Sequence, residues 1–558
     1  MHVRMSDPRS TGRFIIRNGW IVDGSGAPGF WGELLIGHGK ITRVSEKVEA
    51  EDAAVIDADG GVVCPGFLDT HSHSGPHLFH DPLMEPKLRQ GITTEILGQD
   101  GISLAPVSAG HLPVWKAQVE EIEGLSPNID WAACGSVADY LARMKRLGVS
   151  GNYGYLVPHG NLRMAVMGME NRFADSSRLE AMCALLEREM QSGALGLSTG
   201  LIYAPCSFAN TTELSSLCRV VARRDGVFAV HQRSEANGIL SSMEELLQIA
   251  RESGVRLHIS HFKICGKQNW NKAERIFALL DAAKQEGIRV TFDLYPYTAG
   301  CTALSVLLPP WVHEGGREQL CGRLRDLPTR RKIKEEILET NSRWDNFVEF
   351  AGLDGIVITK SQNAQLIGKN LPELGEMQGK DPLDAVFDLL LSESGTGIID
   401  YYGSEDVLDS LIQRPEQNFC TDGEVCAHPH PRLYGSFPRV FSRFVREKRL
   451  LTLEQAIHKM TGLPAETFSL TGRGLIREGS CADLVIFDQS EIQDRATYLD
   501  PTLYSSGIHM VMVNGVPVLL NGKNRKKPAG EILCRQAQEK IKFDNSLTAR
   551  KAGAGPLR

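Results

Sequence analysis

Two patterns of apolar and polar positions separate the ends of the chain from its middle. At both ends, short apolar runs alternate with polar residues and turn signals, which is typical of antiparallel strands. The runs are residues 14–17, 20–23, 34–36, 53–56, 483–487, 510–513 and 516–520. Neither end has enough strands for a closed sheet by itself. We therefore expect both ends to meet in one small β-sandwich.

Two Asn-Gly pairs predict tight turns within this sandwich. Asn18-Gly19 separates the first two runs, and Asn514-Gly515 separates the last two. Both central residues of a type I′ turn need a positive φ, which Asn and Gly tolerate best. The pattern predicts a β-hairpin at each pair.

The middle of the chain repeats one unit, made of an amphipathic helical pattern, a glycine and a short apolar strand. Helices are predicted at residues 178–191, 212–224, 241–252 and 272–286. Glycine ends helices in the left-handed conformation, and parallel strands need a helical crossover between them. The repetition is typical of a parallel α/β fold.

Eight candidate strands can be counted in and around these units. They are residues 62–68, 93–97, 153–157, 195–198, 228–230, 257–260, 290–292 and 418–421. Eight parallel strands can close into a (β/α)8 TIM-like barrel. About 125 residues separate the last two strands, which is too long for one ordinary connection. We expect an inserted helical subdomain or lid there.

These patterns predict a domain organisation with a discontinuous first domain. The β-sandwich is expected to comprise residues 1–66 and 476–558. The barrel is expected at 67–475, with the insertion at 302–400.

Composition excludes several classes of protein. The 558 residues are 42% hydrophobic, which excludes wholesale disorder. A net charge of −7 without a long basic run argues against a nucleic-acid partner. We find neither an apolar run long enough to span a membrane nor a secretory signal, so no membrane association is expected. The 12 scattered cysteines form no C-x-x-C pair, which favours a reduced, cytoplasmic protein.

Metal-binding residue types follow most of the predicted strands. They are His71, His73, Asp100, His159, His231, His261, Asp293 and Asp422. The carboxyl ends of barrel strands converge on one face, and imidazole and carboxylate are ligands that zinc prefers. His71 and His73 are two residues apart, so both can point to one side of an extended chain. An isolated pair of this kind can also be two solvated loop histidines that fall close together by chance.

Longer motifs carry a family resemblance. Residues 65–73, Pro-Gly-Phe-Leu-Asp-Thr-His-Ser-His, resemble the first-strand signature of the amidohydrolase superfamily. Further segments resemble its N-acyl-D-amino-acid deacylase (D-aminoacylase) branch. They are residues 90–94, 258–263, 295–300, 430–432, 435–439, 472–476 and 479–488.

The resemblance implies roles for the residues at the strand ends. It implies that His71 and His73 bind one metal position, that His231 and His261 bind a second, and that Asp422 is the general acid/base. The branch usually carries a Cys ligand after the second strand, whereas this chain has Asp100. A carboxylate can bind or bridge zinc but favours harder ions, so one or two zinc ions or other divalent ions are expected. In the alternative interpretation, Asp100 only shapes its loop, the later histidines are buried core residues, and Asp422 forms a turn.

The resemblance also implies a substrate. The expected reaction is metal-dependent hydrolysis of the linear amide of a small N-acyl-D-amino acid. Lys263, Tyr295 and Arg432 are expected to bind its carboxylate, Tyr203 to line the pocket and His159 to orient the carbonyl. Surface salt bridges are the alternative for the cations, and a loop-capping role for His159.

Two other functions stay open. One is another amidohydrolase activity, on a cyclic amide or a D-dipeptide; the fourth strand lacks the lysine of hydantoinase-like relatives, which disfavours the cyclic amide. The other is a non-catalytic barrel scaffold, which the complete set of candidate ligands disfavours. The oligomeric state is open.

Overall fold

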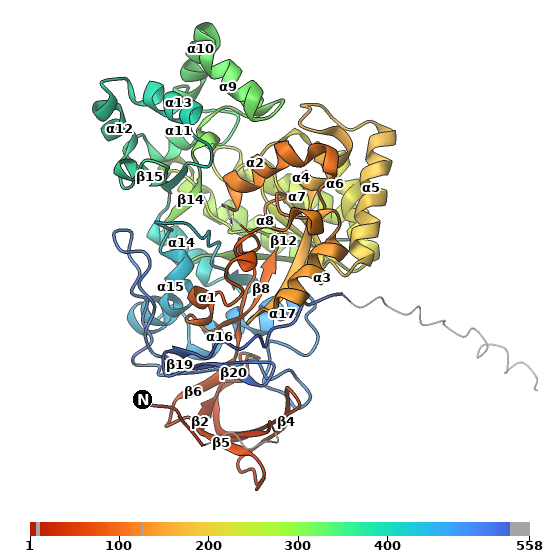
Figure 1. Cartoon of the computed structure of the whole chain (residues 1–558), viewed down its shortest axis with the longest axis vertical. Helices are drawn as coiled ribbons and strands as arrows, with labels where there is room; N and C mark the ends of the chain where they lie inside the picture. The colour runs from red at the N-terminus through yellow and green to blue at the C-terminus, as the bar shows by residue number, and fades with distance from the viewer. Residues whose placement is uncertain (7–11, 125–127, 536–558) are drawn as a thin grey trace, which may run out of the picture.

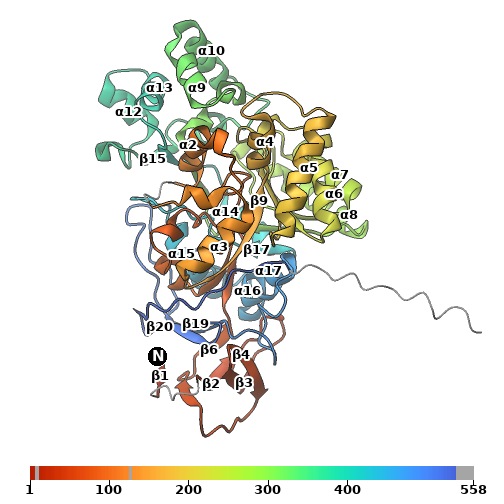
Figure 2. The same cartoon turned by 45° about the vertical axis from the view of Figure 1, so that its right-hand side comes forward.

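The structure is a computed structural model that describes residues 1–6, 12–124 and 128–535. A central barrel carries a terminal β-sheet at one end and an inserted segment at the other (Figures 1 and 2). Among the described residues, no helix is both long and apolar enough to cross a bilayer.

Eight parallel strands form the barrel, as predicted. In order around it they are β7 (Phe67–Asp69), β8 (Ile92–Leu97), β9 (Asn152–Pro158), β10 (Gly196–Gly200), β11 (Val227–His231), β12 (Arg256–Ile259), β13 (Val290–Leu294) and β17 (Gln417–Phe419). The ring closes just beyond the ends of β7 and β17, where Ser72 bridges to Gly423 and the N–H of Asp422 donates to His71 O at 2.9 Å. This closure brings the first and last strand ends together.

The helices around the barrel include the four that were predicted. These are α5 (Ser176–Gln191), α6 (Thr211–Arg223), α7 (Ile239–Ser253) and α8 (Ala273–Gln285). Asp175 and Asn210 cap the first two by accepting backbone N–H bonds, and Gly254 ends α7 in the left-handed conformation. The other helices of the barrel region are α1 (Glu85–Leu88), α2 (Leu112–Ile122), α3 (Val137–Leu147), α4 (His159–Met167), α14 (Glu405–Ile412), α15 (Arg432–Arg439), α16 (Leu453–Met460) and α17 (Gly462–Thr467).

Both ends of the chain contribute to one mixed sheet of ten strands, which confirms the sandwich formed by both ends. The strands are β1 (Arg4–Met5), β2 (Phe14–Ile21), β3 (Phe30–Gly37), β4 (Lys40–Ser45), β5 (Ala54–Asp57), β6 (Val62–Pro65), β18 (Leu484–Phe487), β19 (Ile508–Val513), β20 (Val516–Leu520) and β21 (Lys523–Asn524). β6 and β18 join the two ends. Along β18, Leu484 and Ile486 pack into the core of this sheet, whereas Val485 and Phe487 pack into the barrel core. The sheet is therefore fixed to the barrel.

One of the two predicted hairpins is wrong. β2 runs straight through Asn18-Gly19, with an irregular register against β3 at this point. A side chain at Gly19 would meet Val63 Cγ2 at 2.4 Å, so the glycine serves close packing rather than a turn. Asn514-Gly515 does form the predicted turn between β19 and β20, with positive φ values of 47° and 78°.

The strand predicted at residues 62–68 is two strands. β6 belongs to the terminal sheet and β7 to the barrel, and Gly66 lies between them. An uninterrupted apolar run does not show where a strand leaves one sheet for another, because every residue in it is buried in either sheet.

The long connection before β17 contains the predicted insertion, at the top left of Figure 1. Its helices are α9 (Arg317–Arg325), α10 (Leu327–Ile337), α11 (Phe347–Ala351), α12 (Leu371–Gln378) and α13 (Pro382–Ser392), and they share an apolar core of their own. The insertion also contains a sheet that was not predicted, made of β14 (Ala299–Ala303), β16 (Gly397–Tyr401) and β15 (Ile356–Lys360) in that order. β14 follows β13 closely, so the insertion begins at the barrel mouth.

Candidate metal centre

The carboxyl ends of five barrel strands bring together the five predicted metal ligands and the predicted general acid/base, Asp422. His71 and His73 follow β7, Asp100 follows β8, His231 ends β11, His261 follows β12 and Asp422 follows β17. Each of the six residues is at most 6% exposed. Buried charged or polar side chains need partners, and these residues find many of theirs in one another.

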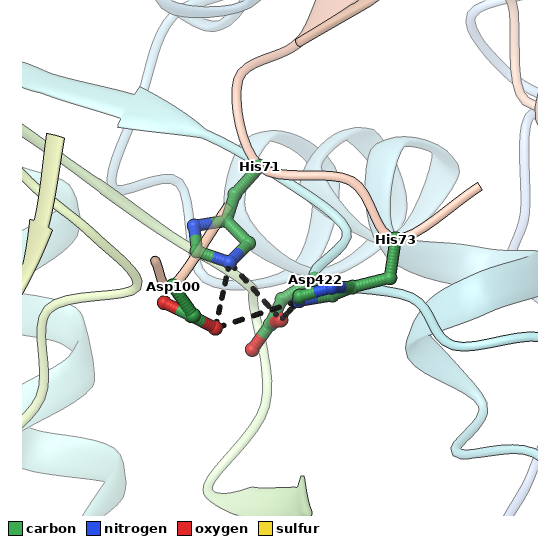
Figure 3. A group of neighbouring side chains, drawn as sticks. All are labelled: His71, His73, Asp100 and Asp422. Carbon is green, nitrogen blue, oxygen red and sulfur yellow. Dashed lines mark hydrogen bonds and ion pairs between the residues drawn. The ribbon is translucent and has the colours of Figure 1, made fainter. Parts of the chain in front are cut away.

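One group consists of His71, His73, Asp100 and Asp422 (Figure 3). Their ligand atoms all lie within 4.8 Å of one another. Nε2 of His71 is 3.3 Å from Asp100 Oδ2, and Nε2 of His73 is 3.2 Å from Asp422 Oδ1. The two imidazoles and two carboxylates thus face a common point.

A second group consists of Asp100, His231 and His261. Nδ1 of His231 is 3.0 Å from His261 Nε2, which is 3.5 Å from Asp100 Oδ1. Asp100 therefore turns one oxygen to each group. A carboxylate in this position can bridge two ions.

The donor set fits a divalent metal ion. Burial opposes protonation of His73 and His261, but neighbouring carboxylates raise both pKa values, so a bound cation would displace these protons. Burial lowers the pKa of His231 to about 3, which keeps it in the neutral form that binds metals. Burial opposes ionisation of Asp100, but the charge of neighbouring His71 and the proximity of His261 and His73 hold its pKa well below the ordinary value. Asp100 Oδ1 and His231 Nε2 are buried without a hydrogen-bond partner. Four imidazoles with carboxylates are a donor set suited to zinc or a similar ion.

Three of the six residues have positive φ values, at 54° for Asp100, 33° for His261 and 49° for Asp422. This conformation is uncommon outside glycine and costs about 1 kcal/mol or more. Each of the three stands in the turn directly beyond a strand. Such strain clusters at functional sites, where the surrounding structure holds it in place.

The predicted substrate-binding cations lie beside the ligands. A cavity with about 530 Å³ of empty space, part of it open to solvent, is lined by Lys263, Tyr295, Arg432 and Tyr203. Asp422 and all the predicted ligands except His71 also line it. Lys263 Nζ lies 2.8 Å from Glu235, and a guanidinium nitrogen of Arg432 lies 2.7 Å from Asp422 Oδ2. The guanidinium carbon of Arg432 also stands 4.6 Å from the centre of the Tyr295 ring.

His159 does not line this cavity. Its two ring nitrogens lie 2.8 Å from Thr199 Oγ1 and 2.8 Å from Glu213 Oε1, and Arg163 binds the same glutamate. These contacts saturate the imidazole, so the expected contact with a substrate carbonyl does not fit the geometry. A structural role at the start of α4 does fit.

Five acidic residues near the site were not predicted: Glu123, Glu235, Asp345, Asp400 and Glu424. All except Glu123 line the cavity. Glu123 Oε1 lies 3.7 Å from Nδ1 of His73, on the side of the ring away from the other ligands. Burial raises the pKa values of Asp345, Asp400 and Glu424 to about 7. Glu235 lies four residues after His231, and Glu424 lies two residues after Asp422. Their closeness in sequence to a predicted site residue is a signal that could have identified them. The other three acidic residues carry no such signal.

Comparison with known proteins places this site in a family. The sequence model of the amidohydrolase family matches residues 54–315 and 339–519. The chain belongs to the amidohydrolase family. Within it, the chain is similar to D-aminoacylase of Alcaligenes xylosoxydans xylosoxydans, with 33% identity over 526 residues that cover 94% of this chain and 98% of the relative. It is also 33% identical to the N-acyl-D-aspartate deacylase of that bacterium, over 95% of this chain and 96% of the relative.

Solved structures of amidohydrolases give the same result. N-acyl-D-glutamate deacylase from Bordetella bronchiseptica, complexed with zinc and a phosphonate inhibitor, matches with a TM-score of 0.78 and 33% identity, covering 93% of this chain and 99% of the other. A crystal structure of D-aminoacylase matches with a TM-score of 0.79 and 32% identity over the same shares. D-hydantoinase, at 16% identity and a TM-score of 0.53, shares the fold alone. The predicted resemblance to the N-acyl-D-amino-acid deacylase branch is confirmed.

Proposed function

We propose that the protein is a metal-dependent deacylase that hydrolyses the linear amide of N-acyl-D-amino acids, releasing a carboxylate and a free D-amino acid. The observation that carries the proposal is that two ligand groups sharing Asp100 lie in one cavity with the buried Arg432 and the half-buried Lys263. Relatives named as deacylases of this class, similar over more than 90% of the chain, support it.

The metal ligands are assigned from their grouping. His71 and His73 would hold one position, His231 and His261 the other, and Asp100 would lie between them. A zinc ion bound there would lower the pKa of a water molecule to about 7 and polarise the amide carbonyl.

Asp422 is proposed as the general acid/base. Burial opposes its ionisation, but the charge of Arg432 and the neighbouring histidines lower its pKa, so it is ionised at neutral pH. In that form its carboxylate can accept the proton of the attacking water. It can then deliver the proton to the amine that leaves.

Lys263, Tyr295 and Arg432 are proposed to bind the carboxylate of the substrate. Arg432 presents a planar fork of donors and Lys263 a point charge. Burial raises the pKa of Tyr295, so its hydroxyl stays protonated and can donate a hydrogen bond. The D configuration is proposed from the relatives, because the positions of these side chains alone do not select a handedness.

Tyr203 is proposed as a wall of the substrate pocket. Its ring stands edge-on to His231, with 5.3 Å between the ring centres, and its hydroxyl lies 3.2 Å from Thr302 Oγ1. Two further proposals come from the sequence alone: the domain boundaries at residues 66/67 and 475/476, and a cytoplasmic location.

A substrate panel with controlled metal content tests the function. Purified enzyme is stripped with a chelator, reloaded with zinc and assayed on N-acetyl D- and L-amino acids, hydantoins and D-dipeptides. We expect hydrolysis of the N-acetyl-D-amino acids that disappears with the metal and returns on reloading. If the reloaded enzyme holds one or more ions per chain yet cleaves only hydantoins or dipeptides, the alternative amidohydrolase activity replaces this proposal. An absence of both bound metal and hydrolysis would favour a scaffold.

A further inference from the structure

A second cavity adjoins the metal cavity at the barrel mouth, and we call it the apolar chamber. It has a volume of about 890 Å³ and is lined by residues of α2, of the loop after β10 and of the insertion. Ile122, Tyr203, Asp345 and Phe347 line both cavities. The apolar chamber is therefore a direct extension of the site.

The lining of the apolar chamber suits an uncharged group. Ile202, Val306, Leu308 and Trp344 are among its walls. Three of its four charged residues have partners. Glu121 accepts a hydrogen bond from Ser305, Arg233 lies 2.9 Å from Glu245, and Asp345 accepts hydrogen bonds from the loop after β11. The fourth, Arg343, is exposed. Burial lowers the pKa of His313, which keeps this wall residue neutral. Ligand sites of this kind bury apolar groups.

One chain of contacts runs from Lys263 through two of the metal ligands to the wall of the chamber. Lys263 Nζ lies 2.8 Å from His261, at the end of the site where Tyr295 stands. The rings of His261 and His231 are 4.5 Å apart, and His231 contacts Tyr203 on the chamber wall. The metal ligands thus lie between the cations and the apolar chamber. With its carboxylate on the cations and its amide at the ligands, a substrate directs its acyl group toward the chamber.

We propose that the apolar chamber binds the acyl group, so that the enzyme prefers D-amino acids carrying apolar acyl groups longer than acetyl. This inference rests on the proposed function and names the class of substrate. The competing occupant is a large apolar side chain of the amino acid.

The test compares kcat/KM for N-acetyl-, N-butanoyl- and N-hexanoyl-D-leucine on the zinc-loaded enzyme. Each buried methylene contributes about fourfold, so a gain on the order of 200-fold is expected from acetyl to hexanoyl, which adds four methylenes. V306W fills the apolar chamber and is expected to abolish this gain while leaving kcat/KM for N-acetyl-D-leucine within about threefold. V516W makes the same change on β20, where Val516 is 38% exposed, and should retain the gain. I202F is a second filling variant, should V306W fail to fold.

Two outcomes of this comparison would overturn the inference. One is a wild-type kcat/KM that stays constant or falls as the acyl group lengthens. The other is a kcat/KM that falls equally for the acetyl and hexanoyl substrates in both filling variants. A series of N-acetyl-D-amino acids with growing side chains tests the competing occupant; a gain there that V306W removes would assign the chamber to the side chain. Hydrolysis of N-acetyl-D-leucine without length dependence contradicts only the chamber, whereas no hydrolysis of any N-acyl-D-amino acid contradicts the proposed function itself.

Discussion

Neighbours on both sides hold the Asp422 carboxylate in one orientation. Oδ2 pairs with Arg432, Oδ1 faces His73 at 3.2 Å, and the backbone N–H donates to His71 O at 2.9 Å. The preceding residue, Thr421, is bound through both its N–H and its hydroxyl to Asp69. A proton acceptor fixed this way needs no reorganisation when a substrate arrives.

Replacing Asp422 by Asn tests its role as a base. The amide keeps the size of the side chain but cannot accept a proton, so kcat should fall by about 10²- to 10⁴-fold. Elemental analysis and a thermal melt serve as controls, and we expect a folded variant that still binds metal through the five proposed ligands. A kcat within fivefold of the wild type would contradict the assignment.

The place of Asp100 between two ligand groups predicts an effect on metal content. The family resemblance implies a Cys at this position in the branch. D100N lacks the charge that attracts both ions, and we expect it to lose about one ion per chain on dialysis, as measured by elemental analysis. D100C restores the usual thiolate of the branch and should bind again, with a preference shifted from harder ions such as manganese toward zinc. Wild-type metal content in D100N would contradict a bridging position.

Tyr295 and Tyr402 form a matched pair for the substrate carboxylate. Their hydroxyls are 2.8 Å apart, but only Tyr295 lines the metal cavity. Y295F should raise KM for a carboxylate-bearing substrate by about tenfold, since a hydrogen bond to a charged group is lost. Y402F removes the neighbouring hydroxyl and should change KM less than threefold. The same KM increase in both variants, measured by steady-state kinetics, would assign the effect to disturbed packing instead.

At this scale, the sequence predicts residues that directly follow a regular strand. The five predicted ligands and Asp422 could be selected from the sequence because each stands at or just beyond the end of an apolar run. Glu123 lies at the end of α2, and Asp345 and Asp400 belong to the insertion. Their approach to the site depends on how distant segments pack, which no local pattern contains. His159 also follows a strand, but Glu213, on α6, binds it away from the cavity.

At the scale of helices and strands, the periodicity of apolar residues was sufficient to predict an element that packs against one neighbouring layer. The four predicted helices each present one apolar face to the barrel and end close to the predicted residues. The errors fall where one segment serves two purposes. Asn18-Gly19 is a turn signal inside a continuous strand, and residues 62–68 pass from one sheet into another.

Gly66, at the passage from β6 to β7, allows a test of this arrangement. A Cβ atom there would lie 2.2 Å from Thr93 Oγ1 on the neighbouring strand. G66A should therefore destabilise the fold by about 1–3 kcal/mol, the usual effect of overpacking. Chemical denaturation measures the difference, with G135A as the matched control because a Cβ at Gly135 meets no atom within 4 Å. Equal stability of the two variants would show that the chain between β6 and β7 can move enough to accommodate the added methyl group.

The whole molecule depends on how the insertion docks on the barrel. Asp345 of the insertion accepts hydrogen bonds from Ser234 Oγ at 2.5 Å and from the N–H of Glu235 at 2.6 Å. Glu349, in α11, accepts one from Asn237 at 3.0 Å. These contacts reach the loop after β11, which carries Glu235 beside His261 and Lys263. Docking of the insertion and the shape of the site are therefore linked through one short loop.

Protonation of Asp345 should make this docking depend on pH. Burial raises its pKa from 3.8 to about 7, so the folded chain binds a proton that the unfolded chain has released between these values. The stabilisation from Asp345 is complete below pH about 4 and is lost as the pH rises toward about 7. D345N resembles the protonated form at every pH. The quantity to measure is the unfolding free energy of D345N minus that of the wild type, at equal metal content. This difference should increase from pH 5 to 7 and then stay constant up to pH 8. Asp400 also titrates near 7 but is present in both proteins, so its contribution cancels. A difference between the two proteins that is constant over this range would mean that the insertion docks independently of this proton.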